Sequence, residues 1–189
     1  MNVTFPAILH DFLTLRGESP DLLPELEEGE DSAVLTLSEA LRVRLLPAAV
    51  EATLALPREE VDIVSSLAVE DADFEFLPSE GGLTSVLTLP LPDNYLRFHS
   101  LRLAGWREGV RSLEASGTLR AELGANAPAW MVCPAHPMVL EDRDGPLRCL
   151  RIYGALRPEG ELQFVPMPVF AADSLSICSR AYPRLLQLL

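Results

Sequence analysis

Apolar residues near the start of the chain recur at the spacing of an amphipathic helix. Phe5, Ile8, Phe12 and Leu15 lie three or four residues apart, so a helix would place them on one face. A proline suits the first turn of such a helix, and a glycine two residues after Leu15 can close it. The pattern therefore predicts a helix over residues 5–15.

A second helical region is predicted over residues 32–56, beyond an acidic, proline-containing connector at residues 18–31. Four alanines between residues 48 and 55 favour helix in its second half. Pro47 lacks the N–H group that a helix interior needs, and its ring crowds the preceding turn. We therefore expect either two helices that meet at Pro47 or one helix kinked there.

From about residue 70 the pattern changes to the alternation of strands. The Gly81-Gly82 pair predicts a hairpin turn that leads into a strand over residues 83–89. Residues 95–103 form a further strand whose apolar positions do not keep one strict alternation. A β-bulge near His99 or Ser100 would reconcile them.

The later part of the chain predicts a meander followed by a helix. Residues 138–141, 147–153 and 161–165 suggest three antiparallel strands joined by two short turns. Residues 175–189 carry an apolar stripe at helical spacing, and Pro183 would kink this helix or begin it afresh.

Helices, then strands, then a helix is the element order of an α+β protein. We expect a mainly helical region at residues 1–68, an antiparallel β-rich region at residues 69–170, and a C-terminal helix at residues 171–189. The last helix is expected to pack back on the first region, which would give one compact unit.

Composition indicates an ordinary globular chain. Of the 189 residues, 48% are hydrophobic and 23% are charged, which is sufficient for a packed core. No apolar run reaches the roughly 18 residues that a membrane helix needs. The first residues also lack the basic region of a signal peptide. We therefore expect a cytoplasmic protein that does not insert into a membrane.

The charge is strongly acidic and unevenly distributed. The net charge of −13 disfavours specific binding to nucleic acid, because phosphates need a basic surface. Residues 1–90 hold 18 acids and 4 arginines (net −14), and residues 91–189 hold 10 acids and 11 arginines (net +1). Such polarity suits contact with partners through opposite faces, although an acidic surface can also simply keep a protein soluble. No lysine occurs, which excludes a P-loop lysine and a Schiff-base lysine.

Cysteine and histidine give the only candidates for chemistry. Cys133 and His136 have the C-x2-H spacing that could supply two zinc ligands or a cysteine–histidine pair. A closed zinc site needs four ligands, and Cys149 and Cys178 each lack a second ligand close in sequence. The alternative is a proline-containing turn beside a buried, reduced thiol. We expect no catalytic residue, no cofactor and no metal ligand.

Three other features each allow a functional and a structural interpretation. Residues 141–145 are rich in acids, but an Asp-Gly pair between alternating strands favours a hairpin over a calcium loop. The acidic residues 25–31 could form a patch for a metal or a cationic partner, yet connectors of this kind are usually solvated. Trp106 and Trp130 could anchor an interface or pack in a core.

One segment resembles a known family. Residues 89–98, Leu-Pro-Leu-Pro-Asp-Asn-Tyr-Leu-Arg-Phe, continue into residues 101–110. This sequence is similar to the Leu-Pro-Asp-Asp-aromatic-Leu-Arg segment of short ring or adaptor proteins at the head-to-tail junction of tailed phages and prophages, especially those of gut anaerobes. Asn94 stands where that family has a second aspartate. The resemblance covers about half the chain, mostly residues 89–154. It suggests Tyr95, Arg97, Trp106 and Arg107 as interface residues.

The resemblance implies an oligomeric structural protein without an active site. The corresponding hypothesis is a head-to-tail connector or tail-assembly subunit, virion-associated, with protein partners that include copies of itself in a ring. Two alternatives remain: a small hydrolase or metal-binding enzyme that uses Cys133 and His136, and a monomeric ligand-binding or adaptor domain.

Overall fold

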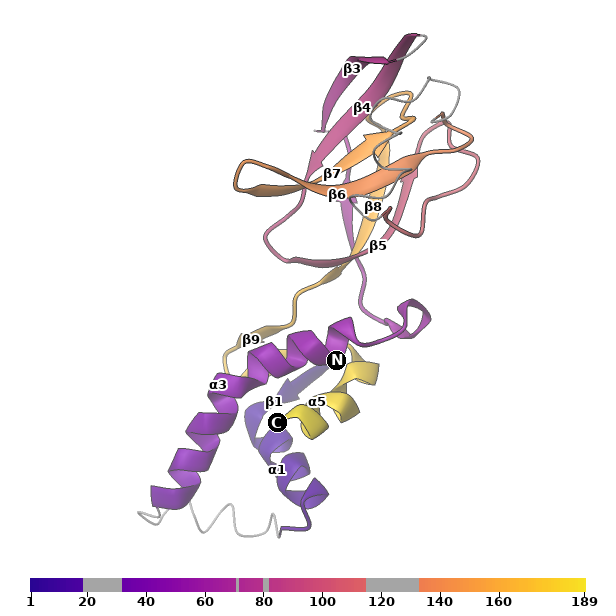
Figure 1. Ribbon diagram of the computed structural model, residues 1–189. Helices are drawn as coiled ribbons and strands as arrows, with labels where there is room; N and C mark the ends of the chain where they lie inside the picture. The colour runs from indigo at the N-terminus through magenta and orange to yellow at the C-terminus, as the bar shows by residue number, and fades with distance from the viewer. Residues whose placement is uncertain (19–31, 71, 80–81, 115–132) are drawn as a thin grey trace. The chain divides into compact units, whose positions relative to one another are not determined.

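The computed structural model describes residues 1–18, 32–70, 72–79, 82–114 and 133–189. Its contacts divide the chain into two compact units (Figure 1). Unit 1 comprises Met1–Ile63 and Met167–Leu189, and unit 2 comprises Val64–Pro166. The predicted α+β class is confirmed. The chain passes from unit 1 to unit 2 after Ile63 and returns to unit 1 after Pro166. The sequence had placed these boundaries after residues 68 and 170.

Unit 1 combines helices with a small antiparallel sheet, in the order β1, β10, β9. Its helices are α1 (Phe5–Leu15), α3 (Ser32–Leu54), α5 (Tyr182–Leu188) and two short 3₁₀ turns, η2 (Arg58–Glu60) and η3 (Ser179–Ala181). Its strands are β1 (Asn2–Thr4), β9 (Val169–Ala171) and β10 (Ser174–Ser176). The first and last parts of the chain therefore fold together.

Helix α1 has the predicted bounds. Its proline lies in the first turn, where a missing N–H costs nothing. The predicted apolar stripe is buried at Phe5, Ile8 and Phe12, whereas Leu15 at the end of the helix is exposed. The hydroxyl of Tyr182 donates a hydrogen bond to Asp11 Oδ2 at 2.7 Å and ties α5 to α1.

Helix α3 is one continuous helix that passes through Pro47. Of the two predicted alternatives, one helix through Pro47 is present, and that of two separate helices is wrong. Proline is tolerated because its side chain is exposed, so the carbonyl that loses its helical donor can be solvated by water.

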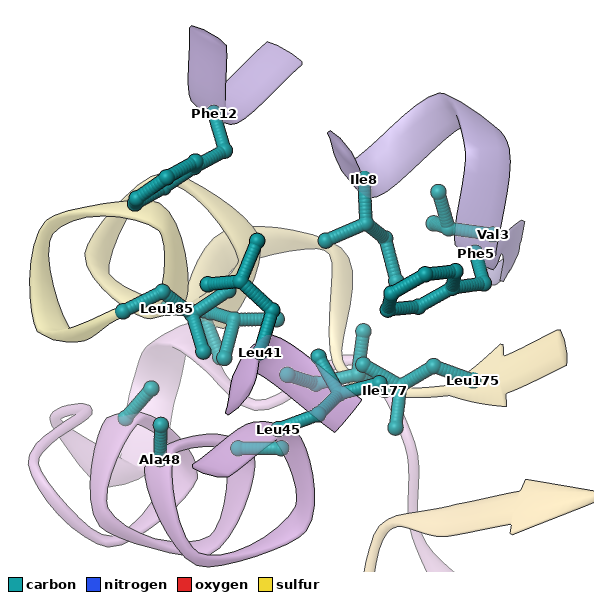
Figure 2. Packing of buried hydrophobic residues seen from close by; sticks show 14 of the residues in the cluster. Val3, Phe5, Ile8, Phe12, Leu41, Leu45, Ala48, Leu175, Ile177 and Leu185 are labelled. Carbon is teal, nitrogen blue, oxygen red and sulfur yellow. The ribbon is translucent and has the colours of Figure 1, made fainter. Parts of the chain in front are cut away.

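The core of unit 1 lies between the helices and the sheet. Figure 2 shows Leu41, Leu45 and Ala48 of α3 directed towards Leu175 and Leu185. All five side chains are buried, and Leu45, Leu175 and Leu185 have no exposed surface. Burying such aliphatic side chains contributes roughly 1.5–3 kcal/mol each, so this layer holds α3 in place.

The C-terminal segment differs from its prediction. Residues 174–176 form strand β10, and the α-helix begins only at Tyr182, so a helix from residue 175 is wrong. The cause is a period of two: Leu175 and Ile177 are buried while Ser176 is exposed, which suits a strand better than a helix. Pro183 lies in the first turn of α5, as one of the two predicted alternatives required.

Unit 2 is built from two antiparallel sheets. One has the strand order β2, β8, β5, and the other has the order β3, β4, β7, β6. The first contains β2 (Ser65–Ala68), β5 (Tyr95–Leu103) and β8 (Gly160–Pro166). The second contains β3 (Asp73–Ser79), β4 (Gly82–Pro90), β6 (Met138–Asp144) and β7 (Leu147–Tyr153).

Most of the strand predictions for unit 2 are confirmed. Strands β3 and β4 pair antiparallel as far as Ser79 and Gly82, while Gly81 of the predicted turn lies outside the described residues; β6 and β7 pair as a hairpin. The pairing of β5 with β8 shifts register between Phe98 and Ser100, where the bulge was predicted. The three-stranded meander is wrong, because β8 pairs with β2 and β5 and not with β7.

Candidate interaction surface

Helix α3 is apolar on two opposite faces. Its inner face, formed by Leu41, Leu45, Ala48, Ala49 and Ala52, is buried in the core of unit 1. Its outer face is formed by Val43, Leu46, Pro47, Val50 and Leu54. These positions are three or four residues apart, so they form one stripe along the helix.

The outer face is largely open to solvent. Val43 is 78% exposed, Leu54 45% and Leu46 38%. Pro47 is also exposed, and Val50 is half-buried. Single apolar residues on a surface need no explanation, but a continuous stripe on one helix is typical of a contact surface. A surface helix that packs against one core normally carries polar residues on its other side.

Two arginines help to fix the rotation of α3. Arg42 forms a 2.5 Å ion pair with Asp173, and its guanidinium lies 4.0 Å from the centre of the Phe5 ring. Arg44 donates a 2.9 Å hydrogen bond to the carbonyl of Leu188. The hydrogen bond from Arg42 holds the pKa of Asp173 below its usual value. These contacts and the buried inner face together keep the outer face directed away from the core.

A second exposed feature is the end of the β6–β7 hairpin in unit 2. Strand β4 pairs with β7 only from Tyr153 to Cys149, so the hairpin continues beyond it. Diagonal ion pairs join the two strands at the base of this extension: Arg148 contacts Glu141 at 2.6 Å, and Arg151 contacts Asp142 at 2.9 Å.

Beside the turn of this hairpin, Leu147 is 62% exposed. The pairing of β6 with β7 also shows that residues 141–145 form part of a hairpin, as predicted. A single apolar side chain presents much less surface than the outer face of α3.

The four predicted interface residues differ in their exposure to solvent. Tyr95 and Trp106 are only 2% and 4% exposed, so both belong to the core of unit 2. The indole N–H of Trp106 donates a 3.0 Å hydrogen bond to the carbonyl of Gly154. Arg97 is half-buried, and Arg107 is exposed. Of the four, only Arg107 is freely available to a partner.

Tyr95 anchors the base of the β6–β7 hairpin. The guanidinium of Arg148 lies 5.0 Å from the centre of its ring and donates a 3.4 Å hydrogen bond to its carbonyl. Burial raises the pKa of the Tyr95 hydroxyl well above its usual value, and the negative charge of Glu141 raises it further. The positive charge of Arg148 offsets part of this effect. A neutral phenol in this position is suited to packing.

Cys133 and His136 form a tight turn. The backbone N–H of His136 donates a 2.8 Å hydrogen bond to the carbonyl of Cys133. The Cys133 side chain is half-buried and that of His136 is exposed. All three cysteines are free; Cys149 and Cys178 are buried, whereas the predicted burial of the Cys133 thiol is only partial. The acidic residues 25–31 and Trp130 lie outside the described residues.

Two features are absent from the residues that the structure describes. No group of three or more His, Cys, Asp or Glu side chains there is arranged to hold a metal ion. No helix in the described part of the chain is both long and apolar enough to cross a bilayer.

The outer face of α3 was not identified from the sequence, although a signal for it was present. Residues 43, 46, 50 and 54 repeat at helical spacing on the side opposite Leu41 and Leu45. A helix that is apolar all round is usually buried or in contact with a partner. The surface can exclude water against another apolar surface, which is a binding role. Comparison with known proteins adds no relative: no family model, curated protein or solved structure matches the chain.

Proposed function

We propose that the protein is a non-enzymatic structural subunit that docks against other macromolecules through the outer face of α3. The more specific proposal is a head-to-tail connector or tail-assembly subunit of a tailed phage or prophage. The exposure of Val43, Leu46 and Leu54 along one helix carries the first statement. The resemblance of residues 89–110 to phage ring and adaptor proteins supports the second.

The physical argument is that a rigid apolar stripe gains free energy when a partner covers it. Each square ångström of apolar surface removed from water contributes about 25 cal/mol. The inner face already fixes α3, so a partner that covers the outer face need not order the helix first. Little conformational entropy is then lost on docking.

The charge supports a role beside passing DNA. With a net charge of −13, the chain repels a phosphate backbone at long range. A connector must let the genome pass without retaining it, so an acidic protein suits such a conduit.

The decisive experiment is analysis of purified particles. We expect mass spectrometry of particles induced from the host to detect the chain at a fixed low copy number per particle. We also expect the genes beside its own to encode portal, capsid or tail proteins. Absence from the particles, together with neighbouring genes for metabolic enzymes, would refute the phage proposal.

A pair of variants tests whether the outer face is responsible. Val43→Glu adds one negative charge at a 78% exposed position, where glutamate also favours helix, so folding should be retained. Gln187→Glu adds the same charge at an exposed position of α5. We expect Val43→Glu to be excluded from particles and Gln187→Glu to be incorporated. Normal incorporation of both would contradict a docking role for α3.

A further inference from the structure

The flank of the outer face carries one charge of each sign. Successive residues of an α-helix are rotated by about 100°, so Glu51 lies about 80° and Arg44 about 100° from Val43. Both side chains are exposed, and they lie on the same side of the apolar stripe. The stripe is therefore bordered on one side by an acid and a base separated by two helical turns.

We propose that the partner of the outer face in the free protein is a second copy of this chain, with the two α3 helices packed antiparallel. This inference rests on the proposed docking role of α3 and names its occupant. A twofold axis perpendicular to the helices would bring identical apolar stripes together. Such an isologous contact uses the same patch on both subunits.

The charges select the antiparallel arrangement. Around a twofold axis at residue 48, the middle of the stripe, Leu46 of one copy lies opposite Val50 of the other. Glu51 then lies opposite position 45, which is about 1.5 Å along the axis from Arg44. An antiparallel pair brings equivalent flanks together, so an Arg44–Glu51 contact forms twice.

A parallel pair leaves Glu51 without a base to contact on the partner's α3. It would bring the flank of Arg44 and Glu51 of one helix against the other flank of its partner, where the charged residues of α3 are Glu39 and Arg42. Arg44 would then face an acid and a base together, and Arg42 already contacts Asp173. Charge complementarity therefore favours the antiparallel pair.

The size of the stripe sets the strength of the contact. A stable interface typically buries about 800 Å² on each partner, and five side chains on one helix provide less. We therefore expect reversible association with a dissociation constant in the micromolar range. A weak dimer of this kind can separate when a higher-affinity partner covers the same face.

Sedimentation velocity of the 189-residue chain over a range of concentrations tests the proposal. The wild-type chain should shift from monomer to dimer as concentration rises. Arg44→Glu and Glu51→Arg should each weaken the dimer roughly tenfold, because each replaces two attractions with two repulsions. The double variant, Arg44→Glu with Glu51→Arg, should recover most of the wild-type affinity.

The double variant is the internal control for folding. Arg44→Glu also removes the hydrogen bond to Leu188, and the double variant does not restore that bond. Recovery of the dimer can therefore come only from the contact between copies. Circular dichroism of each variant confirms that the helices remain formed.

Three outcomes would overturn the proposal. They are a wild-type chain that stays monomeric, a dimer insensitive to both single variants, and a dimer that the double variant fails to restore. A monomeric chain whose Val43→Glu variant is still excluded from particles would reject the dimer and leave the docking role intact. A dimer in a protein absent from particles would retain the contact between copies and reject the phage assignment.

Discussion

The two faces of α3 predict opposite responses to the same kind of truncation. Leu45 on the inner face has no exposed surface, and Val43 on the outer face is 78% exposed. Leu45→Ala removes three buried carbon atoms, worth about 2.4 kcal/mol of transfer free energy. The cavity left behind raises the expected loss to about 3–4 kcal/mol.

Val43→Ala should leave stability almost unchanged. Only about a fifth of the valine is buried, so losing two carbon atoms costs about 0.3 kcal/mol. Alanine favours helix over valine by about 0.5 kcal/mol, which offsets that loss. The expected change in the free energy of unfolding is therefore within about 0.5 kcal/mol of zero.

Urea denaturation followed by circular dichroism at 222 nm measures both variants, because the α-helices lie in unit 1 within the described residues. The protein is kept dilute so that association does not contribute. Equal losses for the two variants would show that the outer face is also packed, and the interpretation of α3 would fail. A loss below about 1 kcal/mol for Leu45→Ala would contradict the assigned core.

Three further predictions concern a close contact between strands, a turn and a capping contact. Gly160→Ala should destabilise unit 2 by about 2 kcal/mol or more, because the added Cβ would lie 2.3 Å from the carbonyl oxygen of Arg102; tryptophan fluorescence in urea reports the loss. Ala172→Asn should raise the melting temperature, since residue 172 has a φ of 48° that asparagine tolerates better than alanine; an unchanged or lower melting temperature would argue against this turn. Asp62→Asn should cost stability at neutral pH and progressively less in acid. Burial raises the pKa of Asp62, but hydrogen bonds from Cys178 and Ser179 lower it by a larger amount. The pKa of Asp62 therefore lies below its usual value of 3.8. The carboxylate therefore stabilises the fold above about pH 4, and that contribution disappears as the pH falls through the lowered pKa. Parallel stability curves for wild type and variant between pH 3 and pH 7 would refute this role.

The sequence predicts local structure well where one period dominates. The stripe from Phe5 to Phe12 has only a helical interpretation, so the bounds of α1 follow from it directly. The bulge in β5 is likewise visible as a break in alternation. Gly145 has a φ of 59°, which suits the turn that its Asp-Gly pair predicts.

The sequence does not indicate which strands pair when they lie far apart in the chain. Nothing around residues 161–165 indicates that β8 pairs with β2 and β5 instead of continuing a meander from β7. Strand β10 was assigned to a helix because Leu175 and Cys178 also fit a period near 3.6. Its pairing with β1, about 170 residues earlier in the chain, decides the structure.

The candidate site also depends on information that local sequence patterns do not provide. The resemblance to phage ring proteins suggested Tyr95 and Trp106 as interface residues, but their environment in unit 2 makes them core residues. The sequence shows two apolar faces on α3, but only the structure shows which of them is buried and which is exposed. Composition alone treats both sides of that helix as equally apolar.

The most direct test of the central claim is footprinting of α3 with a photoactivated carbene, in the dilute free chain and in the particle that contains it. If another macromolecule covers the outer face, labelling of Val43 and Leu54 should fall strongly in the particle while labelling of Gln187 on α5 changes little. Equal labelling of Val43 and Leu54 in both states would contradict the account.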